Sequence, residues 1–290
     1  MKLAWSILFA GLVFVLVFCS SENSPDQDPD KKEWISLFNG HNLDGWTPKI
    51  RGVPLGENYL NTFRVHQGVL QANYEDYKDF DDRYAHLFYK DSFSYYHLIA
   101  EYRTVGDSTI PGAPDWAYRN NGLMLHAQPP ETMGFEQDFP ISLEMQLLSG
   151  NGVDERPTAN LCTPGTHVHL ADTLYTGHCI QSTSKTYNGD TWVRVEAIVL
   201  GDSIIHHIVE GDTVFTYTKP VLGKGVVNEY DPEYLVEGKP VKSGYITIQG
   251  ESHPTEFRKI ELLDLCGCTD KKAKNYKRYF IRSDNRKCVY

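Results

Sequence analysis

The sequence predicts an all-β fold, a sandwich or a barrel built from many short strands. Aromatic residues make up 12% of the chain, with 18 Tyr and 13 Phe, and such residues are enriched in strands. Between Trp34 and Leu265, apolar residues alternate with polar ones, and no long segment follows the i, i+3, i+4 spacing of an amphipathic helix. Gly, Pro, Asn and Asp separate these segments, as turns between short strands require.

The composition excludes several classes of protein. Hydrophobic residues make up 41% and charged residues 23% of the chain, a balance that neither a disordered chain nor a polytopic membrane protein shows. Lys and Arg number 28 against 38 Asp and Glu, which gives a net charge of −10. Because the middle of the chain carries no Lys- or Arg-rich run, nucleic acid is not expected as a partner.

The first 33 residues predict export followed by a tether. Residues 1–19 combine a positive start with an apolar run that is too short for a stable membrane span and typical of an export signal. The run ends in Leu16-Val17-Phe18-Cys19, which resembles a bacterial lipobox and predicts lipid attachment at Cys19. An uncleaved anchor and a simple signal peptide are the alternatives.

Residues 20–33 form a polar, acidic tether that cannot bury a core. Acidic residues directly after the cysteine resemble the surface-export signal of lipoproteins in Bacteroidetes-type bacteria. We therefore expect an outer-membrane lipoprotein of the bacterial cell envelope, attached to the membrane through its N-terminal lipid and either periplasmic or surface-exposed.

Five further cysteines follow Cys19, and outside the cytoplasm paired cysteines are usually disulfides. Cys162 and Cys179 flank one loop and are expected to bridge it. Cys268 and Cys288 are expected to close the C-terminal residues, which leaves Cys266 unpaired. A Cys266–Cys288 bond is the alternative, since Cys266 and Cys268 are only two residues apart in the sequence. A zinc site at Cys266-Gly267-Cys268 is disfavoured, because no second close cysteine pair accompanies it.

The alternation of apolar and polar residues indicates where the strands of the body lie along the chain. Apolar and polar residues alternate in the segments 97–103, 141–147, 191–199, 245–248 and 257–265. Within 204–217, two apolar runs flank Glu210-Gly211-Asp212, which is a hairpin signal. Because successive side chains of a strand point to opposite faces, Leu143 and Met145 are expected in the core, with Glu144 and Gln146 on the other face.

Several motifs, taken in order, resemble one family. Ile35 to Gly40 (ISLFNG) and Leu43 to Trp46 (LDGW) resemble the opening of the 3-keto-disaccharide hydrolase family. Further segments follow in the family's order: FRVHQGVL (63–70), EYR (101–103), NNGLMLH (120–126), SLEMQ (142–146), WVRVE (192–196) and IQGESHP (248–254). The resemblance covers residues 34–265. It implies a concanavalin A-like jelly-roll β-sandwich of two antiparallel sheets.

The C-terminal residues 266–290 differ from this body. They resemble a short cysteine-bounded module found at the ends of exported Bacteroidetes proteins, and they are basic where the body is acidic. That charge suits docking on the main domain or on an anionic glycan. A solvated appendage is the interpretation that we favour.

The resemblance implies an unusual route to glycoside cleavage. Members of the family act on sugars that carry a ketone at C3, which acidifies the proton at C2. A base removes that proton, the enolate expels the C1 substituent, and water then adds across the double bond. The required groups are a general base, a donor or cation for the enolate oxygen, and an acid for the leaving group.

The strand around Glu144 supplies the first group of candidates. Glu144 is the first candidate for a catalytic carboxylate, and Gln146 shares its face as a substrate-binding residue. On the segment 120–126, alternation puts His126 on the face of Gly122, within reach of Glu144 if the two strands are neighbours. Arg119 and Asn121, which replaces the family's serine, are expected to bind substrate at the mouth of this strand.

A second group lies near the C-terminal end of the body. Ile246 and Ile248 are expected to point inward, which sends Gln249 and Glu251 to the opposite face. Glu251 and His253 are candidate catalytic residues, and Gln249 is a candidate substrate-binding residue. His207, just before the hairpin turn, is a further substrate-binding candidate.

No cofactor is expected, although a divalent metal remains open. His167, His169 and His178 lie near Cys162 and Cys179, and His-x-His spacing on a strand suits a metal, but no acidic partner stands at a telling spacing. The expected ligand is an oligosaccharide or another glycoside. The main hypothesis is a 3-keto-glycoside-cleaving enzyme; the alternative is a lectin-like protein without turnover, because one fold hosts both. A conventional two-carboxylate glycosidase is a weaker third hypothesis.

Overall fold

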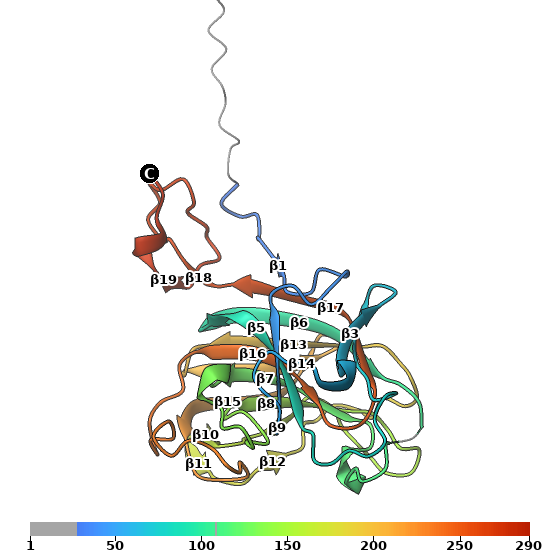
Figure 1. The fold of residues 1–290 in the computed structure, drawn as a ribbon. Coiled ribbons are helices and arrows are strands. Elements are labelled where there is room, and N and C mark those ends of the chain that lie inside the picture. The colour runs from blue at the N-terminus through green and yellow to red at the C-terminus, as the bar shows by residue number, and fades with distance from the viewer. Residues whose placement is uncertain (1–27, 108) are drawn as a thin grey trace, which may run out of the picture.

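The structure is a computed structural model that describes residues 28–107 and 109–290. The predicted signal, the lipid attachment at Cys19 and most of the tether therefore lie outside the described residues. The described chain forms two large antiparallel sheets packed face to face (Figure 1). This arrangement confirms the predicted all-β jelly-roll sandwich.

The larger sheet, sheet A, is built around the long pairing of β6 with β17. A short strand, β1 (Ile35–Ser36), pairs with β17 as well. The remaining order across sheet A is β11 (Thr173–Tyr175), β10 (Thr166–Leu170), β15 (Asp212–Leu222), β14 (Ile204–Val209), β13 (Val193–Leu200), β6 (Tyr95–Thr104), β17 (Thr255–Asp264), β4 (Val69–Ala72) and β3 (Phe63–His66).

The smaller sheet, sheet B, brings together the strands that carry most of the predicted site residues. Its order is β12 (Cys179–Ile180), β9 (Asn160–Cys162), β8 (Leu143–Leu148), β7 (Asn120–Ala127), β16 (Gly244–Gly250), β5 (Ala85–Phe93) and β2 (Trp46–Ile50). Strands β7 and β8 are direct neighbours, as the prediction for residues 120–147 assumes.

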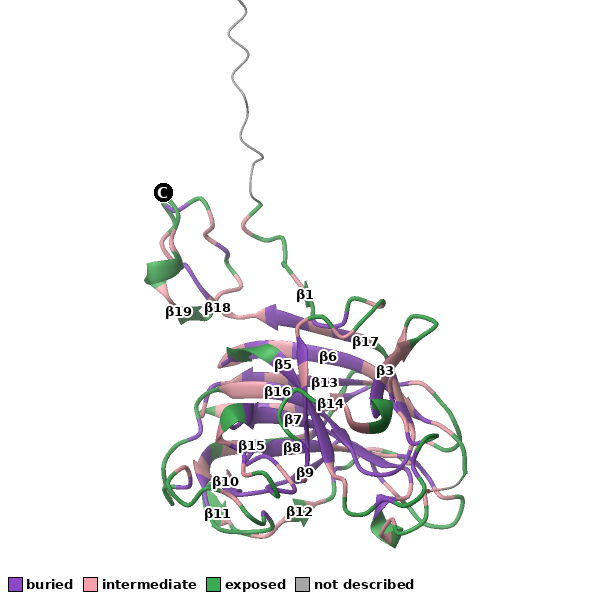
Figure 2. Ribbon diagram, in the orientation of Figure 1, coloured by how far each residue is buried: buried purple, intermediate pink, exposed green. Residues whose placement is uncertain are grey.

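The core lies between the two sheets, where the strands are buried along their length (Figure 2). Leu98 and Tyr102 of β6 belong to the same core cluster as Leu143 and Met145 of β8, and all four are fully buried. The predicted alternation of these strands is confirmed. Ile141 differs from the prediction, because it precedes β8 and packs in a separate small cluster.

Helical structure is limited to four short 3-10 turns in the described chain. They are η1 (Tyr59–Asn61), η2 (Asp115–Ala117), η3 (Pro130–Thr132) and η4 (Asn285–Lys287). Among the described residues, no helix has the length and hydropathy needed to cross a membrane.

Both predicted disulfides are present. Cys162 and Cys179 join β9 to β12, and Cys268 and Cys288 close the C-terminal module, with Cys266 left as a free thiol. Two disulfides are typical of proteins that fold outside the cytoplasm. Within the module, β18 (Cys266–Gly267) pairs in parallel with β19 (Arg282–Ser283).

The C-terminal module contacts the N-terminal segment, contrary to the favoured expectation of a solvated appendage. Figure 1 shows the module at the end of β17, beside the first described residues. Lys277 is only 3% exposed, and its Nζ lies 2.6 Å from a carboxylate oxygen of Glu33. The backbone N–H of Arg278 donates to the carbonyl of Pro29. The basic module therefore binds the acidic end of the tether.

Because of this contact, we expect the tether to be protected from proteolysis. Lys277→Met removes a buried cation and leaves Glu33, which is exposed enough to be hydrated. A local loss of about 1 kcal/mol opens the segment about fivefold more often. We therefore expect trypsin to cleave after Lys31 or Lys32 about fivefold faster than in the wild type, measured by mass spectrometry. Lys271→Met, at an exposed position of the same module, is the control. Equal cleavage rates in all three proteins contradict the proposed contact.

Candidate active site

The outer face of sheet B carries a row of polar side chains across five strands. Cross-strand register pairs Lys49 with His86, His86 with Gln249, Gly122 with Gln146, and Gln146 with Asn160. Each residue alternates with core residues on its own strand, so the row faces away from the sandwich core. Glu144 lies on the same face of β8, two residues before Gln146.

Loops cover this face and enclose a cavity of about 490 Å³. Its volume lies within the range of small-molecule sites. The residues around it come from sheet B and from the loops on either side: Trp116, Asn120, Phe139, Glu144, Gln146, Leu148, Arg156, Cys162, Pro164, His178, Cys179, Val226 and Glu251. The predicted residues Glu144, Gln146 and Glu251 thus line one pocket.

Two buried carboxyl groups form the chemical centre of the pocket. Glu144 is 5% exposed and Glu251 is 2% exposed. Burial raises the pKa of Glu144 to about 8. Burial and the nearby Glu144 carboxylate together raise the pKa of Glu251 well above its usual value. These raised pKa values keep both carboxyl groups protonated at neutral pH, and Glu144 is the first of the two to ionise as the pH rises toward 8.

Gly122 makes room for the side chains of Glu144 and Gln249. A Cβ atom at residue 122 would lie 2.5 Å from Oε1 of Glu144 and 2.8 Å from Oε1 of Gln249. The two side chains therefore converge over the bare backbone of β7. Both amide atoms of Gln249 are buried, and neither has a hydrogen-bond partner among the described residues, although buried polar atoms are usually paired.

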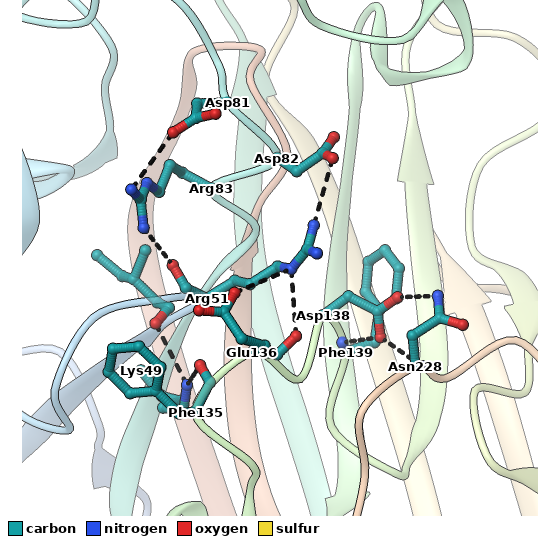
Figure 3. Close-up of polar contacts among 11 residues, drawn as sticks. Lys49, Arg51, Asp81, Asp82, Arg83, Phe135, Glu136, Asp138, Phe139 and Asn228 are labelled. Atoms are coloured by element: carbon teal, nitrogen blue, oxygen red, sulfur yellow. Dashed lines mark hydrogen bonds and ion pairs between the residues drawn. The ribbon is translucent and has the colours of Figure 1, made fainter.

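The segment 135–139 covers the β5 side of the pocket and is tied down at both ends (Figure 3). Nζ of Lys49 donates to the carbonyl of Phe135 at 3.1 Å, and Nε of Arg51 donates to the carbonyl of Glu136 at 3.1 Å. At the other end, Nδ2 of Asn228 donates to the Asp138 carboxylate at 2.6 Å. These contacts fix the position of Phe139, which follows Asp138 directly.

Phe139 closes the pocket over a buried histidine. The rings of His86 and Phe139 meet edge to face, with centroids 5.9 Å apart. Burial lowers the pKa of His86 to about 3, with a smaller effect from Lys49, so the imidazole is neutral. Neither of its ring nitrogens finds a partner within the described chain. Tyr84 packs on Phe139 and stacks on Trp116, which extends the aromatic wall to the rim.

The opposite wall contains the Cys162–Cys179 disulfide and His178. Potential metal-ligating atoms of these three residues lie within 4.8 Å of one another, the one such group of three in the described part of the chain. Because both sulfurs are bonded to each other, they are not available as thiolate ligands. His167 and His169 do not join this group, so the structure offers no His-x-His metal site among the residues it describes.

Comparison with known proteins identifies the family. A family model described as the 3-keto-α-glucoside-1,2-lyase-like domain matches residues 33–263. The chain belongs to this family. The match confirms the resemblance that the sequence motifs indicate.

Several solved structures resemble this lyase-like chain. Two candidate glycosyl hydrolases from Parabacteroides distasonis ATCC 8503 align with TM-scores of 0.47 and 0.46, at 14% and 18% identity. The alignments cover 80% and 79% of this chain, and 93% and 98% of the other chains. LamA from Z. galactanivorans, solved with laminaritriose and laminaritetraose, aligns at TM-score 0.44 and 10% identity over 80% of this chain and 97% of its own. A search of curated proteins finds no match.

His126 does not reach the pocket of the lyase-like domain, contrary to the prediction. Tyr245 pairs with Ala127 and Thr247 with Met124, so β7 contains one extra residue at this point. His126 has a φ of 51° within this bulge. Because a bulge reverses the faces beyond it, Nε2 of His126 contacts the carbonyl of Gly201, on sheet A's side of the core.

His207 is also a core residue rather than a binding residue. It lies on the inward face of β14, fully buried. Its Nδ1 is 3.0 Å from the carbonyl of Ala159, and its Nε2 is 3.3 Å from the hydroxyl of Tyr217. Both ring nitrogens are therefore engaged between the sheets, and the predicted contact with substrate is wrong.

Arg119 and Asn121 do not line the pocket, contrary to the prediction. The guanidinium of Arg119 is enclosed by Asp107, Thr104 and the Gly189 carbonyl. Nδ2 of Asn121 donates to the backbone carbonyl of Gln249, so this side chain links β7 to β16. Asn120 and Arg156 line the pocket instead.

His253 and Gln249 lie behind the residues that line the pocket. His253 follows Glu251 by two residues and is fully buried, with its ring 5.3 Å from that of Tyr118. Burial, with a further effect of Arg119, lowers the pKa of His253 to about 4. Neither residue is among those that line the cavity.

Sequence reasoning missed several residues of the site, among them His86 and Arg156. Strand alternation could have found His86. Leu87 and Tyr89 enter the core, so His86 and Phe88 must face the opposite side of the sheet. Arg156 lies in an irregular loop after β8, where no periodicity could place it. It is held at the pocket because its Nη2 donates to the carbonyl of Tyr118.

Proposed function

We propose that this protein cleaves 3-keto-glycosides by elimination across C1 and C2, followed by hydration. The observation that carries the proposal is the pair of buried carboxyl groups, Glu144 and Glu251, which line one pocket and both have raised pKa values. Elimination needs a base and an acid at the same time, and the pair supplies both once Glu144 has ionised while Glu251 still holds its proton. Membership of the 3-keto-α-glucoside-1,2-lyase-like family supports the same chemistry.

The first step moves the C2 proton of the sugar to the ionised carboxylate of the pair. The electron pair of the C2–H bond forms the C2–C3 double bond, and the C3 ketone becomes an enolate. Arg156 and Gln146 line the pocket and are the donors we assign to the enolate oxygen. A positioned donor of this kind contributes most where charge develops in a site that excludes water.

The second step breaks the bond between C1 and the leaving group. The enolate electrons form a C1–C2 double bond and restore the ketone, while the protonated carboxyl gives its proton to the departing oxygen. The carboxylate that served as the acid then takes a proton from water as the hydroxyl adds to C1, and the carboxyl that served as the base, after exchange with solvent, gives a proton to C2. This completes a net hydrolysis. Both carboxyl groups return to their starting state, so no cofactor is consumed.

Release of the leaving group tests this proposal. The purified protein is incubated with 3-keto-glucosides and with their unoxidised parents, and the free aglycone is measured by chromatography. We expect release from the 3-keto compounds only. Binding of the glycosides without release would favour the lectin-like alternative instead.

Gly122→Ala tests whether the geometry over β7 matters. The added Cβ forces the Glu144 carboxyl and the Gln249 amide apart, and a displacement of about 1 Å in a reacting group costs about a hundredfold in rate. We expect kcat to fall about a hundredfold while circular dichroism is unchanged. Gly225→Ala, where a Cβ meets nothing within 4 Å, is the matched control. A Gly122→Ala variant with the kcat of the control contradicts this account of the pocket.

We also propose that the protein works in the bacterial cell envelope, anchored through a lipid on Cys19. The two disulfides support a location outside the cytoplasm. Mass spectrometry of the protein from its native membrane is expected to show an acylated Cys19 at the N-terminus. An unmodified Cys19 or an intact Met1 contradicts the anchor and leaves the enzymatic proposal untouched.

A further inference from the structure

The pocket has two walls of different chemistry, one on each side of the carboxyl pair. Phe139 and Trp116 form an aromatic wall on the side of β5. The wall on the side of β9 and β12, here called the aliphatic wall, consists of Leu148, the Cys162–Cys179 disulfide, Pro164 and Val226. The order of sheet B places β8 and β16, which position Glu144 and Glu251, between the two walls.

The aliphatic wall is part of a fixed structure. The backbone N–H of Gly165 donates to the carbonyl of Gly225, which holds Pro164 beside Val226. The backbone N–H of Thr163 donates to the carbonyl of His178, and the disulfide joins the strands on either side. The wall is therefore built before a ligand arrives.

Hydrogen-bonding groups are scarce on this wall. The side chains of Leu148, Pro164 and Val226 carry no polar atom, and the cysteine sulfurs are bonded to each other. His178 is the polar neighbour. Burial lowers its pKa, so it adds no charge, and its buried Nδ1 has no partner among the described residues. Two further unpartnered polar atoms belong to Glu251 and Asn120 at the floor of the pocket, beside the carboxyl pair.

This distribution separates two classes of leaving group. A second sugar on the aliphatic wall would lose water from several hydroxyl groups and find a single side-chain partner there, the ring of His178, which is costly. A flat apolar ring has no such hydroxyl groups and gains from burial against the wall. The polar floor and the aromatic wall remain for the 3-keto sugar that all substrates share.

We propose that the aliphatic wall binds an apolar aromatic aglycone, so that aryl 3-keto-glycosides, rather than 3-keto-disaccharides, are the preferred substrates. This inference rests on the proposed function, and it names the substrate class of the same site. Val226 is the residue of the aliphatic wall best suited to mutation. It is 51% exposed at the rim, so we expect it to tolerate substitution without disturbing the core.

The test compares kcat/KM for the 3-keto derivatives of a phenyl glucoside and of a disaccharide with the same anomeric configuration. The wild type is expected to favour the phenyl compound at least tenfold. Val226→Asn is expected to reduce that ratio about tenfold, the size of effect that small changes in an apolar pocket produce. Trp116→Ala is expected to lower both values and to leave the ratio unchanged. Val153→Asn, at a residue that is 87% exposed and does not line the cavity, is the control.

A wild type that prefers the disaccharide, or a ratio that Val226→Asn leaves unchanged, overturns the inference while the proposed function stands. Failure of the proposed function would appear differently, as no release from any 3-keto-glycoside. Calorimetric binding of the unoxidised phenyl glucoside then still tests the wall. Weaker binding to Val226→Asn than to the wild type supports it, and equal binding overturns it.

Discussion

Glu144→Gln is expected to lose a hundredfold or more of the turnover of 3-keto-glucosides while gaining stability. The amide has nearly the shape of the protonated carboxyl but can neither accept nor donate the transferred proton, and loss of a general base or acid costs this much. The gain in stability follows from burial, because the wild type must hold an ionisable group out of water.

The sign of the pH dependence follows from the raised pKa of Glu144. In the unfolded chain this carboxyl ionises near pH 4.5, whereas the folded protein retains the proton to about pH 8. The wild type therefore loses stability as the pH rises through this window, and the variant does not. Urea unfolding is expected to show a gain on the order of 2 kcal/mol at pH 8.5 and little gain at pH 4.5. Glu57→Gln, an exposed substitution, is the control. A variant with full turnover, or with a gain that is largest at pH 4.5, contradicts the role of Glu144.

The second large effect is a loss of stability in mild acid, caused by buried neutral histidines. Burial is the main cause of the low pKa values of His86, about 3, and of His126, His207 and His253, about 4 each. Unfolded histidines ionise near pH 6.5. The stability that these groups contribute is therefore complete above pH 6.5 and is lost as the pH falls toward 4.

The carboxyl pair acts in the opposite direction over part of this range. Near pH 5.5, unfolding takes up about four protons on the histidines and releases about two from Glu144 and Glu251, a net uptake of about two. The free energy of unfolding is thus expected to peak near pH 6.5 and to fall by about 2 to 3 kcal/mol per pH unit below pH 6. Urea titrations from pH 4.5 to 8.5 measure this curve. His207→Gln removes one of the four histidines and is expected to make the acid limb less steep. A stability that rises continuously from pH 7 to pH 5 contradicts the assignment.

Strand alternation was sufficient to predict three residues of the pocket, Glu144, Gln146 and Glu251. Leu143 and Met145 had to enter the core, so Glu144 and Gln146 had to face away from it, and the structure places them there. The same reasoning with Ile246 and Ile248 placed Glu251. These predictions succeeded because a regular strand allows only two directions for each side chain.

The failures come from places where the backbone is irregular. The bulge in β7 moves His126 into the core, and no residue type in that segment reveals the extra residue. Arg119, with a φ of 50°, is turned into a closed network, while Arg156 arrives at the pocket from a loop. Loops also bury the outer face of sheet B, which alternation alone would leave open to solvent. The closed pocket, and with it the raised pKa values of its carboxyl groups, could not be predicted from strand patterns.

The most direct test of elimination is the fate of the hydrogen at C2. A 3-keto-glucoside with natural hydrogen at C2 is turned over in D2O, and the sugar product is examined by NMR at early times, beside a sample of the 3-keto sugar incubated alone. The carboxyl-pair mechanism predicts a product with deuterium at C2, formed faster than the free sugar exchanges, and no such product from the Glu144→Gln variant. Release of the leaving group with the C2 hydrogen fully retained would show direct displacement at C1 and would contradict the mechanism.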